Sequence, residues 1–289
     1  MPGLRTIALT VLAMLAFAAN SLLCRMALAH TTIDAASFTA IRLVSGAIVL
    51  WLLVALRGRA QANSGNWWSA FALFAYAAGF SFAYVSLTAA TGALLLFGAV
   101  QVTMIGHGLW RGERLHVMQM FGCAAAFAGL VGLLLPGLSA PPLAGALLML
   151  GAGFAWGVYS LRGRQALDPV TVTAGNFVRA VPFALVLAFA LWRERSVDGT
   201  GMTYAIASGA LASGMGYVIW YAALPRLQPT SAAIVQLSVP LLAAAGGVIM
   251  LGEAVTLRLV LASVAILGGI ALVTTRAGQR LDAAARQRR

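Results

Sequence analysis

Polar and aromatic side chains recur inside long apolar stretches of this 289-residue chain. Amide and hydroxyl groups at such positions can hydrogen-bond the ammonium and carboxylate of a zwitterion. Aromatic faces can stack on a ring or hold an ammonium group by cation–π attraction. A cavity that mixes both kinds of group fits a small amphipathic metabolite. The predicted binding residues are Asn20, Tyr76, Ser81, Tyr84, Gln101, His107, Trp156, Tyr159, Tyr217, Trp220, Tyr221, Gln236 and Ser238.

Each of these positions also has a purely structural interpretation. Gln101 and Gln236 favour a cavity, because a buried amide without a partner is costly, but interhelical hydrogen bonding is the alternative. His107 is expected to pack or to reach the membrane surface rather than to carry protons. For Thr103 and Ser213 we expect a hydrogen bond to the backbone one helical turn back. A binding or a packing role stays open for Tyr84, Tyr217 and Trp220.

Four arginines occur in two pairs with the same spacing. Arg25 and Arg42 are 17 residues apart, and so are Arg162 and Arg179. A charge near the end of a membrane span is tolerated where it is paired or reaches the interface. We hypothesise that the four arginines are gate residues in two mirrored polar clusters. The alternative is that each arginine only anchors the end of its helix.

Charged residues exclude several kinds of chemistry. No two His, Cys, Asp or Glu residues have ligand spacing within one apolar stretch, so we expect neither a metal site nor a cofactor. A nucleotide-binding loop of the Walker type is absent, and no acid lies where an intramembrane catalytic triad would need it, so an enzyme is not expected. The same distribution predicts transport without strict proton coupling. All seven acids fall in loops or at span ends: Asp34, Glu113, Asp168, Glu194, Asp198, Glu253 and Asp282.

The composition requires a membrane to position these residues. Hydrophobic residues make up 61% of the chain and charged residues 9%, with a mean hydropathy of +0.91. Soluble domains are about 45–50% apolar and about 25% charged. At about 20 residues a span, the chain has room for roughly ten membrane helices. We predict an all-α membrane protein with spans near 6–29, 37–56, 67–87, 91–110, 118–135, 143–161, 171–192, 204–224, 230–251 and 257–275. A cleaved signal peptide at the first span is a weaker alternative.

The net charge of +12 comes with 19 arginines and no lysine. These charges are too scattered to bind nucleic acid, but they fit a membrane topology. With both termini in the cytoplasm, 13 of them fall on the cytoplasmic side, as the positive-inside rule requires. We expect a multi-pass protein of the bacterial inner membrane that acts as a monomer, with the lipid bilayer and a small-molecule substrate as its partners.

The two halves of the chain resemble each other. Gly112-Glu113 follows the fourth span, and Gly252-Glu253 follows the ninth. Ten residues after Gly112 comes Gly122, which matches Ala262, and Gly129 matches Gly269. The predicted units are a first repeat at 1–138, a second repeat at 139–276 and an Arg-rich cytoplasmic tail at 277–289. Because five spans is an odd number, the second repeat is inverted, as in many secondary transporters whose site lies between the repeats.

The quoted residues resemble the drug/metabolite transporter superfamily, in particular its EamA-type exporters. The resemblance covers essentially the whole chain and includes Asn20, Pro240, Leu251–Glu253 and the pair Trp156-Gly157. The first half departs from the pattern, with Arg-Gly-Glu for Leu-Gly-Glu and Val100 in place of the proline. Size and span number are similar to those of aromatic amino acid exporters in this group. The resemblance implies export of amino acids or similar metabolites; the alternatives are an exporter with an unrelated substrate and a non-transporting scaffold.

Overall fold

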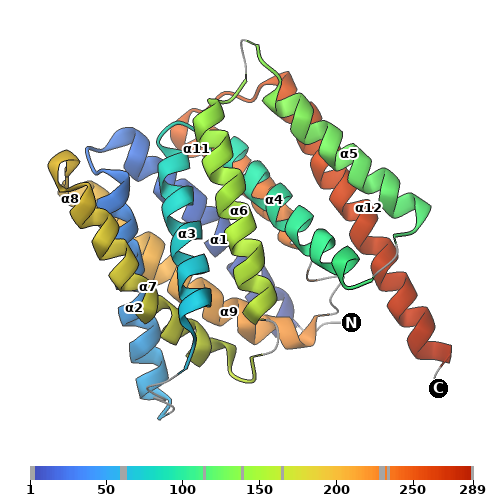
Figure 1. Cartoon of the computed structure of the whole chain (residues 1–289), viewed down its shortest axis with the longest axis horizontal. Helices are drawn as coiled ribbons and strands as arrows, with labels where there is room; N and C mark the ends of the chain where they lie inside the picture. Colours follow the sequence, from blue (N-terminus) through green and yellow to red (C-terminus); the bar gives the residue numbers. More distant parts are fainter. Residues whose placement is uncertain are drawn as a thin grey trace.

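The chain forms a bundle of long helices in a computed structural model (Figure 1). The structure describes residues 4–58, 64–112, 115–137, 140–163, 166–227, 232 and 235–287, with side chains as far as residue 273. The first half contains α1 Leu4–His30, α2 Ala35–Leu56, α3 Trp67–Tyr84, α4 Ala89–Trp110 and α5 Val117–Leu134. The second half contains α6 Leu143–Gly163, α7 Pro169–Ala190, η1 Trp192–Glu194, α8 Gly199–Ala207, η2 Ser208–Met215, α9 Gly216–Ala223, η3 Leu224–Arg226, α11 Ser238–Leu251 and α12 Leu257–Gln287.

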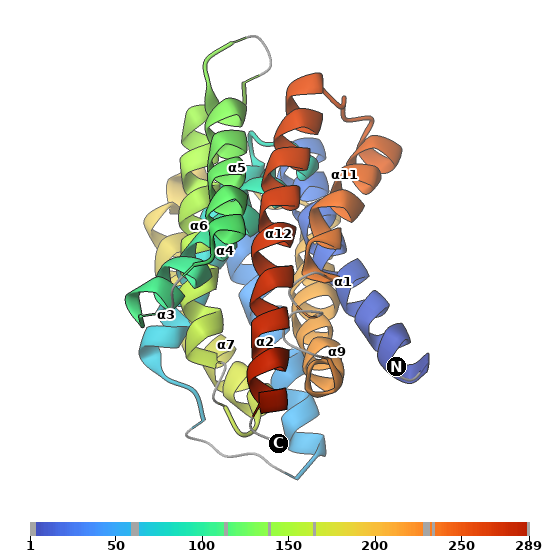
Figure 2. The same ribbon diagram turned by 90° about the vertical axis from the view of Figure 1, so that its right-hand side faces the viewer.

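The predicted all-α membrane fold with ten helices is confirmed over the described residues, because α8, η2, α9 and η3 run on as one helix. Seven of the helices are long and apolar enough to cross a membrane, and α11 and the apolar part of α12 are shorter. Many large apolar side chains point outward, which suits contact with lipid. Both termini lie towards the same end of the bundle (Figure 2). We call this the termini end and the other the opposite end.

Helix boundaries differ from the expectation most at three places. The ninth span was expected from 230, but α11 begins at Ser238, after a turn at Leu237. The eighth span begins at Gly199 rather than 204, because the Asp198 side chain accepts a hydrogen bond from the Gly201 N–H and caps the helix. This hydrogen bond also lowers the pKa of Asp198. The last helix continues to Gln287 instead of ending near 275. Its final residues are mostly strong helix formers such as Ala, Leu, Arg and Gln, which have no need of the membrane to form a helix.

Helices pack mainly against helices of the other half. α3 packs on α6, and the equivalent helices α8 and α9 pack on α1. α2 packs on α7, α4 on α11, and α5 on α12, so each of these pairs joins a helix to its own equivalent. This pattern is what a two-fold relation between two five-helix repeats produces. Since five crossings is an odd number, the second repeat runs through the membrane in the opposite sense.

The α5–α12 pair shows the two-fold relation residue by residue. A Cβ placed on Gly122 would lie 2.6 Å from the carbonyl oxygen of Gly269, and one on Gly129 would lie 3.2 Å from that of Ala262. The sequence pairs Gly122 with Ala262 and Gly129 with Gly269, so the two contacts are equivalents of each other. The absence of side chains lets the two backbones approach closely (Figures 1 and 2).

The repeated Gly-Glu motif has the same backbone role in both halves. Gly112 follows α4 with φ of 90°, and Gly252 follows α11 with φ of 63°. Residues with a side chain seldom adopt positive φ, so glycine ends both helices in this way. The repeat predicted from these residues therefore has a structural cause at the helix ends as well as in the packing.

Candidate functional site

A buried polar cluster joins helices of both repeats at mid-bundle. The Asn20 side-chain amide on α1 donates to the Tyr76 hydroxyl on α3 at 3.3 Å, and its oxygen accepts from the Ser208 hydroxyl on η2 at 2.7 Å. Arg42 on α2 donates from Nη2 to the same Tyr76 hydroxyl at 3.0 Å. Tyr76 thus links the amide and the guanidinium, and all four side chains are buried.

Aromatic rings extend this cluster towards α6 and α9. Trp156 stacks on Tyr159 and on Tyr217, with ring centroids 5.3 Å and 5.2 Å apart, and lies 4.8 Å from the Tyr76 ring. Phe17 on α1 contacts Tyr217 and Trp220. Trp156 and Phe17 keep part of their surface accessible, whereas the tyrosines around them are buried. Rings arranged like this can stack on a flat apolar ligand.

The structure therefore brings together about half of the predicted binding residues. The residues in the cluster are Asn20, Tyr76, Trp156, Tyr159, Tyr217 and Trp220, together with Arg42. Tyr221 packs half-buried against the same core. Ser208, a polar residue of the predicted eighth span, also joins the cluster. Phe17 and Thr173, whose hydroxyl contacts that of Tyr159 at 3.5 Å, join it without having been predicted. Phe17 lies three residues before Asn20, so helical periodicity could have placed it on the same face of α1.

Other predicted residues have visible structural roles. The Ser81 and Ser238 hydroxyls donate to backbone carbonyls of their own chain segment, at Ala77 and Val235. Tyr84 donates to the Ala89 carbonyl, and its ring lies where a side chain at position 92 would be. His107 contacts Trp110 at the termini end of α4. Gln101 is buried on α4 and Gln236 half-buried just before α11, and among the described residues neither has a ring contact or hydrogen bond to the cluster.

Of the two hydrogen bonds expected from Thr103 and Ser213 to the backbone, the structure contains only the first. The Thr103 hydroxyl donates to the Ala99 carbonyl at 2.8 Å, which confirms that prediction. The prediction for Ser213 is wrong, because its buried hydroxyl has no hydrogen-bond partner in the described part of the chain. Ser213 lies in η2, a π-helical segment, where the i to i+5 pattern shifts the carbonyls out of the register of an α-helix. Such segments are frequent at functional sites.

The four predicted gate arginines are placed at different depths. Arg25 lies at the opposite end of the bundle. Arg162 and Arg179 lie at the termini end, where Arg162 donates to Ser69 and Asn66 and Arg179 donates to the carbonyls of Gly175 and Ser64. Arg42 lies seven residues into α2 and Arg179 ten residues into α7, about 10 Å and about 15 Å along the axes at 1.5 Å a residue. The Arg179 guanidinium reaches back to the Ser64 carbonyl outside the helices, whereas that of Arg42 stays inside the bundle against Tyr76.

An ion pair connects several elements at the opposite end. Arg25 Nε lies 3.1 Å from Glu253 Oε1, and Glu253 Oε2 accepts from the Ala89 N–H at 2.8 Å. Arg25 also donates to the carbonyls of Tyr84 and Val85. The side chains of Arg25 and Glu253 are 18% and 10% exposed, so water screens the pair only partly. The pair joins α1 to the α3–α4 and α11–α12 connections. Glu113, the equivalent of Glu253, lies outside the described residues.

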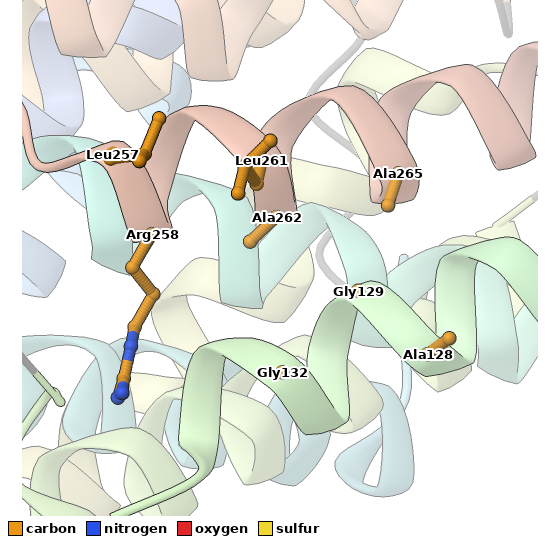
Figure 3. A pocket seen from close by; sticks show the side chains of 8 residues that line it. All are labelled: Ala128, Gly129, Gly132, Leu257, Arg258, Leu261, Ala262 and Ala265. Atoms are coloured by element: carbon orange, nitrogen blue, oxygen red, sulfur yellow. The ribbon is translucent and has the colours of Figure 1, made fainter. Parts of the chain in front are cut away.

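A groove of about 560 Å³ lies between α5 and α12, away from the buried polar and aromatic cluster around Tyr76 (Figure 3). Its walls are small and aliphatic residues, with Arg258 at one end. None of the predicted binding residues lines it. Among the described residues, no group of three His, Cys, Asp or Glu is placed to hold a metal ion.

Comparison with known proteins places the chain in a family. The model of the EamA-like transporter family matches residues 4–135 and again 143–275. An uncharacterised protein of Pseudomonas aeruginosa is 58% identical over 99% of both chains, and an uncharacterised transporter of Archaeoglobus fulgidus is 27% identical over 95% of this chain and 99% of its own.

A further relative has a named substrate. The threonine/homoserine exporter RhtA of Salmonella typhimurium is 37% identical over 43% of each chain. A solved crystal structure with 21% identity superposes with a TM-score of 0.67, covering 96% of this chain and 99% of the other, which shows the common fold. The chain thus belongs to the EamA-like transporter family of the drug/metabolite transporter superfamily, as a multi-pass membrane transporter with two family repeats and not an enzyme.

Proposed function

We propose that this chain exports amino acids, aromatic ones included, across the bacterial inner membrane by alternating access. The buried cluster of Asn20, Tyr76, Trp156 and Tyr217 is the observation that carries the proposal. It combines an amide, hydroxyls and stacked rings at the contact between the two repeats. The likeness to the threonine/homoserine exporter supports an amino acid as cargo.

The proposed orientation puts the termini end in the cytoplasm. Arg57, Arg111 and Arg226 lie at that end, in addition to Arg162, and the tail 277–289 adds more arginine. The domain division follows the repeats, at 1–138 and 139–276. On this assignment Arg25 and Glu253 form the outer gate, and Arg162 and Arg179 belong to the inner one. The working unit is a monomer.

We also propose that transport does not depend strictly on protons. Three of the described acids cap helices at their ends: Asp34, Asp168 and Asp198. Glu253 is paired with Arg25, and Glu194 is exposed in η1. Proton-driven carriers normally place a titratable carboxylate within the membrane, where none of these acids lies.

Counterflow in proteoliposomes tests the proposal. Vesicles loaded with each unlabelled amino acid in turn are diluted into the same labelled compound, without a pH gradient. We expect labelled phenylalanine or threonine to accumulate transiently above equilibrium. If no amino acid does so with correctly folded protein, the cargo is unrelated or the protein is a scaffold. If accumulation needs a pH gradient, the uncoupled mechanism is wrong and His107 becomes the candidate proton carrier.

A further inference from the structure

Arg42 carries a fixed positive charge in the interior of the bundle. Its side chain is 2% exposed, and its guanidinium lies 5.2 Å from the Tyr76 ring centre and 4.9 Å from that of Phe80. Arginine does not lose its proton in proteins, so burial cannot neutralise this group. Nη2 donates to the Tyr76 hydroxyl, but Nη1 is buried and has no hydrogen-bond partner among the residues that the structure describes.

No acid in the described part of the chain neutralises Arg42. Asp34 is eight residues away on the same helix and accepts hydrogen bonds from the N–H groups of Ser37 and Ser196. Glu253 is engaged by Arg25 and the Ala89 N–H. A buried guanidinium without an anion is costly in a membrane protein, and such residues usually mark the path of a substrate or an ion.

The second repeat does not repeat this arrangement. Arg179, the equivalent of Arg42, is only half-buried and donates to backbone carbonyls of Gly175 and Ser64. The position equivalent to Tyr76 is Ser213, whose buried hydroxyl bonds to none of the described residues. If a buried charge were needed only for helix packing, the equivalent helices α2 and α7 would both contain one. The asymmetry favours a role that is needed once.

The surroundings of Arg42 are suited to an amphipathic anion. Tyr76 connects the guanidinium to the Asn20 amide on one side and to the Trp156 ring on the other. The π-helical segment η2 packs directly on α2 here, since a Cβ on Gly209 would overlap the Arg42 carbonyl oxygen. A guanidinium is matched in shape to a carboxylate, to which it can donate two parallel hydrogen bonds.

We propose that Arg42 binds the carboxylate of the transported substrate, so that the substrate class is carboxylates with a flat or apolar body. On this proposal, which rests on the proposed amino acid export, the carboxylate is required for binding and the ammonium group is not. Arg42 is then a substrate-binding residue and not, as the sequence alone suggests, part of a gate. The cluster is closed around it in this conformation, and opening of either end exposes it.

Matched analogues test the proposal in the full-length protein. Competition with labelled L-phenylalanine or L-threonine, whichever is exchanged, is measured for the amino acid, its amide and, in the phenyl series, 3-phenylpropionate. We expect the amino acid and 3-phenylpropionate to compete and the amide to be at least about 30-fold weaker. Arg42→Met abolishes the difference between acid and amide, Arg42→Lys retains part of it, and Arg258→Met on α12 leaves it unchanged.

A binding measurement separates this proposal from the proposed function. The thermal stability of purified protein is followed with 3-phenylpropionate and with 3-phenylpropanamide. If no amino acid is exchanged but the acid alone stabilises the wild type and not Arg42→Met, amino acid export is wrong and the carboxylate site stands. If the amide stabilises or competes as well as the acid, the role of Arg42 is refuted. Absence of both exchange and carboxylate-dependent binding refutes both.

Discussion

Loss of the Glu253 charge should open the outer end of the bundle. In Glu253→Gln the volume is kept, but Arg25 loses its anionic partner at 3.1 Å and retains only the carbonyls of Tyr84 and Val85. The gross Coulomb attraction at this distance is about 5 kcal/mol for an effective dielectric constant near 20. Desolvation and the remaining hydrogen bonds offset much of it. Exposed ion pairs contribute about 0.2–1 kcal/mol to stability, and loss of one partner of a buried pair costs about 3–5 kcal/mol. For this half-buried pair we therefore expect the loss of the Glu253 charge to cost about 2 kcal/mol.

This free energy converts into a measurable change of accessibility. If the pair forms only when the outer end is closed, about 2 kcal/mol shifts the closed-to-open ratio about 30-fold. Cys24 is a native reporter, because it is fully buried and directly precedes Arg25. With Cys123 replaced by serine, a membrane-impermeant maleimide added outside intact cells should label Cys24 about 30 times faster in Glu253→Gln. Glu194→Gln, an exposed acid at the same end, is the matched control.

A gate role for the ion pair is refuted if Cys24 reacts at the same rate in Glu253→Gln and in the wild type while both exchange substrate. The ion pair would then be a helix anchor and not part of a gate. Equal acceleration in Glu194→Gln would show that the effect is one of surface charge rather than of this contact.

Three other changes give distinct readouts. Arg42→Met removes a charged hydrogen bond and cation–π contacts, about 3–5 kcal/mol together, but also a desolvation cost of several kcal/mol. Thermal unfolding should show a net change within about 2 kcal/mol although the preference for the acid over the amide is lost, and a much larger loss of stability would indicate a structural arginine. Gly122→Ala should destabilise the α5–α12 contact by about 1–3 kcal/mol, whereas Gly132→Ala, where a Cβ meets nothing within 4 Å, should be neutral or stabilising. Equal effects of the two substitutions on thermal unfolding would contradict the close approach of the α5 and α12 backbones at Gly122. Trp156→Ala should change substrate selectivity and Gln101→Ala should not, which competition by a panel of unlabelled amino acids measures. The opposite result would indicate that the binding site lies along α4.

The fold could be predicted largely from sequence, because its determinants are local or periodic. Apolar length predicts each span, and the repeated Gly-Glu pair marks helix ends where positive φ requires glycine. Gly122 and Gly129, which mark the repeat, also lie at the reciprocal contacts of α5 and α12, but the sequence comparison did not predict those contacts. Helix boundaries were less accurate, since the Asp198 cap shifts the start of α8 to Gly199.

The site was predicted less well, because residue type alone does not say where a helix face points. Asn20, Tyr76, Trp156 and Tyr217 meet as expected, but Ser81 and Ser238 bond to the backbone. The depth of Arg42 depends on how α2 packs against η2 and α3, which its spacing from Arg25 does not reveal. The sequence pattern also did not predict the π-helical segment that contains Ser213, whose hydroxyl bonds to none of the described residues.

A structure of the protein with a bound substrate tests the central claim most directly. The ligand would be the amino acid that counterflow identifies, or 3-phenylpropionate if none is exchanged. We expect its carboxylate within hydrogen-bonding distance of Arg42 Nη1 and its apolar body against the Trp156 ring. A ligand found instead beside Gln101 and Gln236, with Arg42 still bonded only to Tyr76, would contradict it.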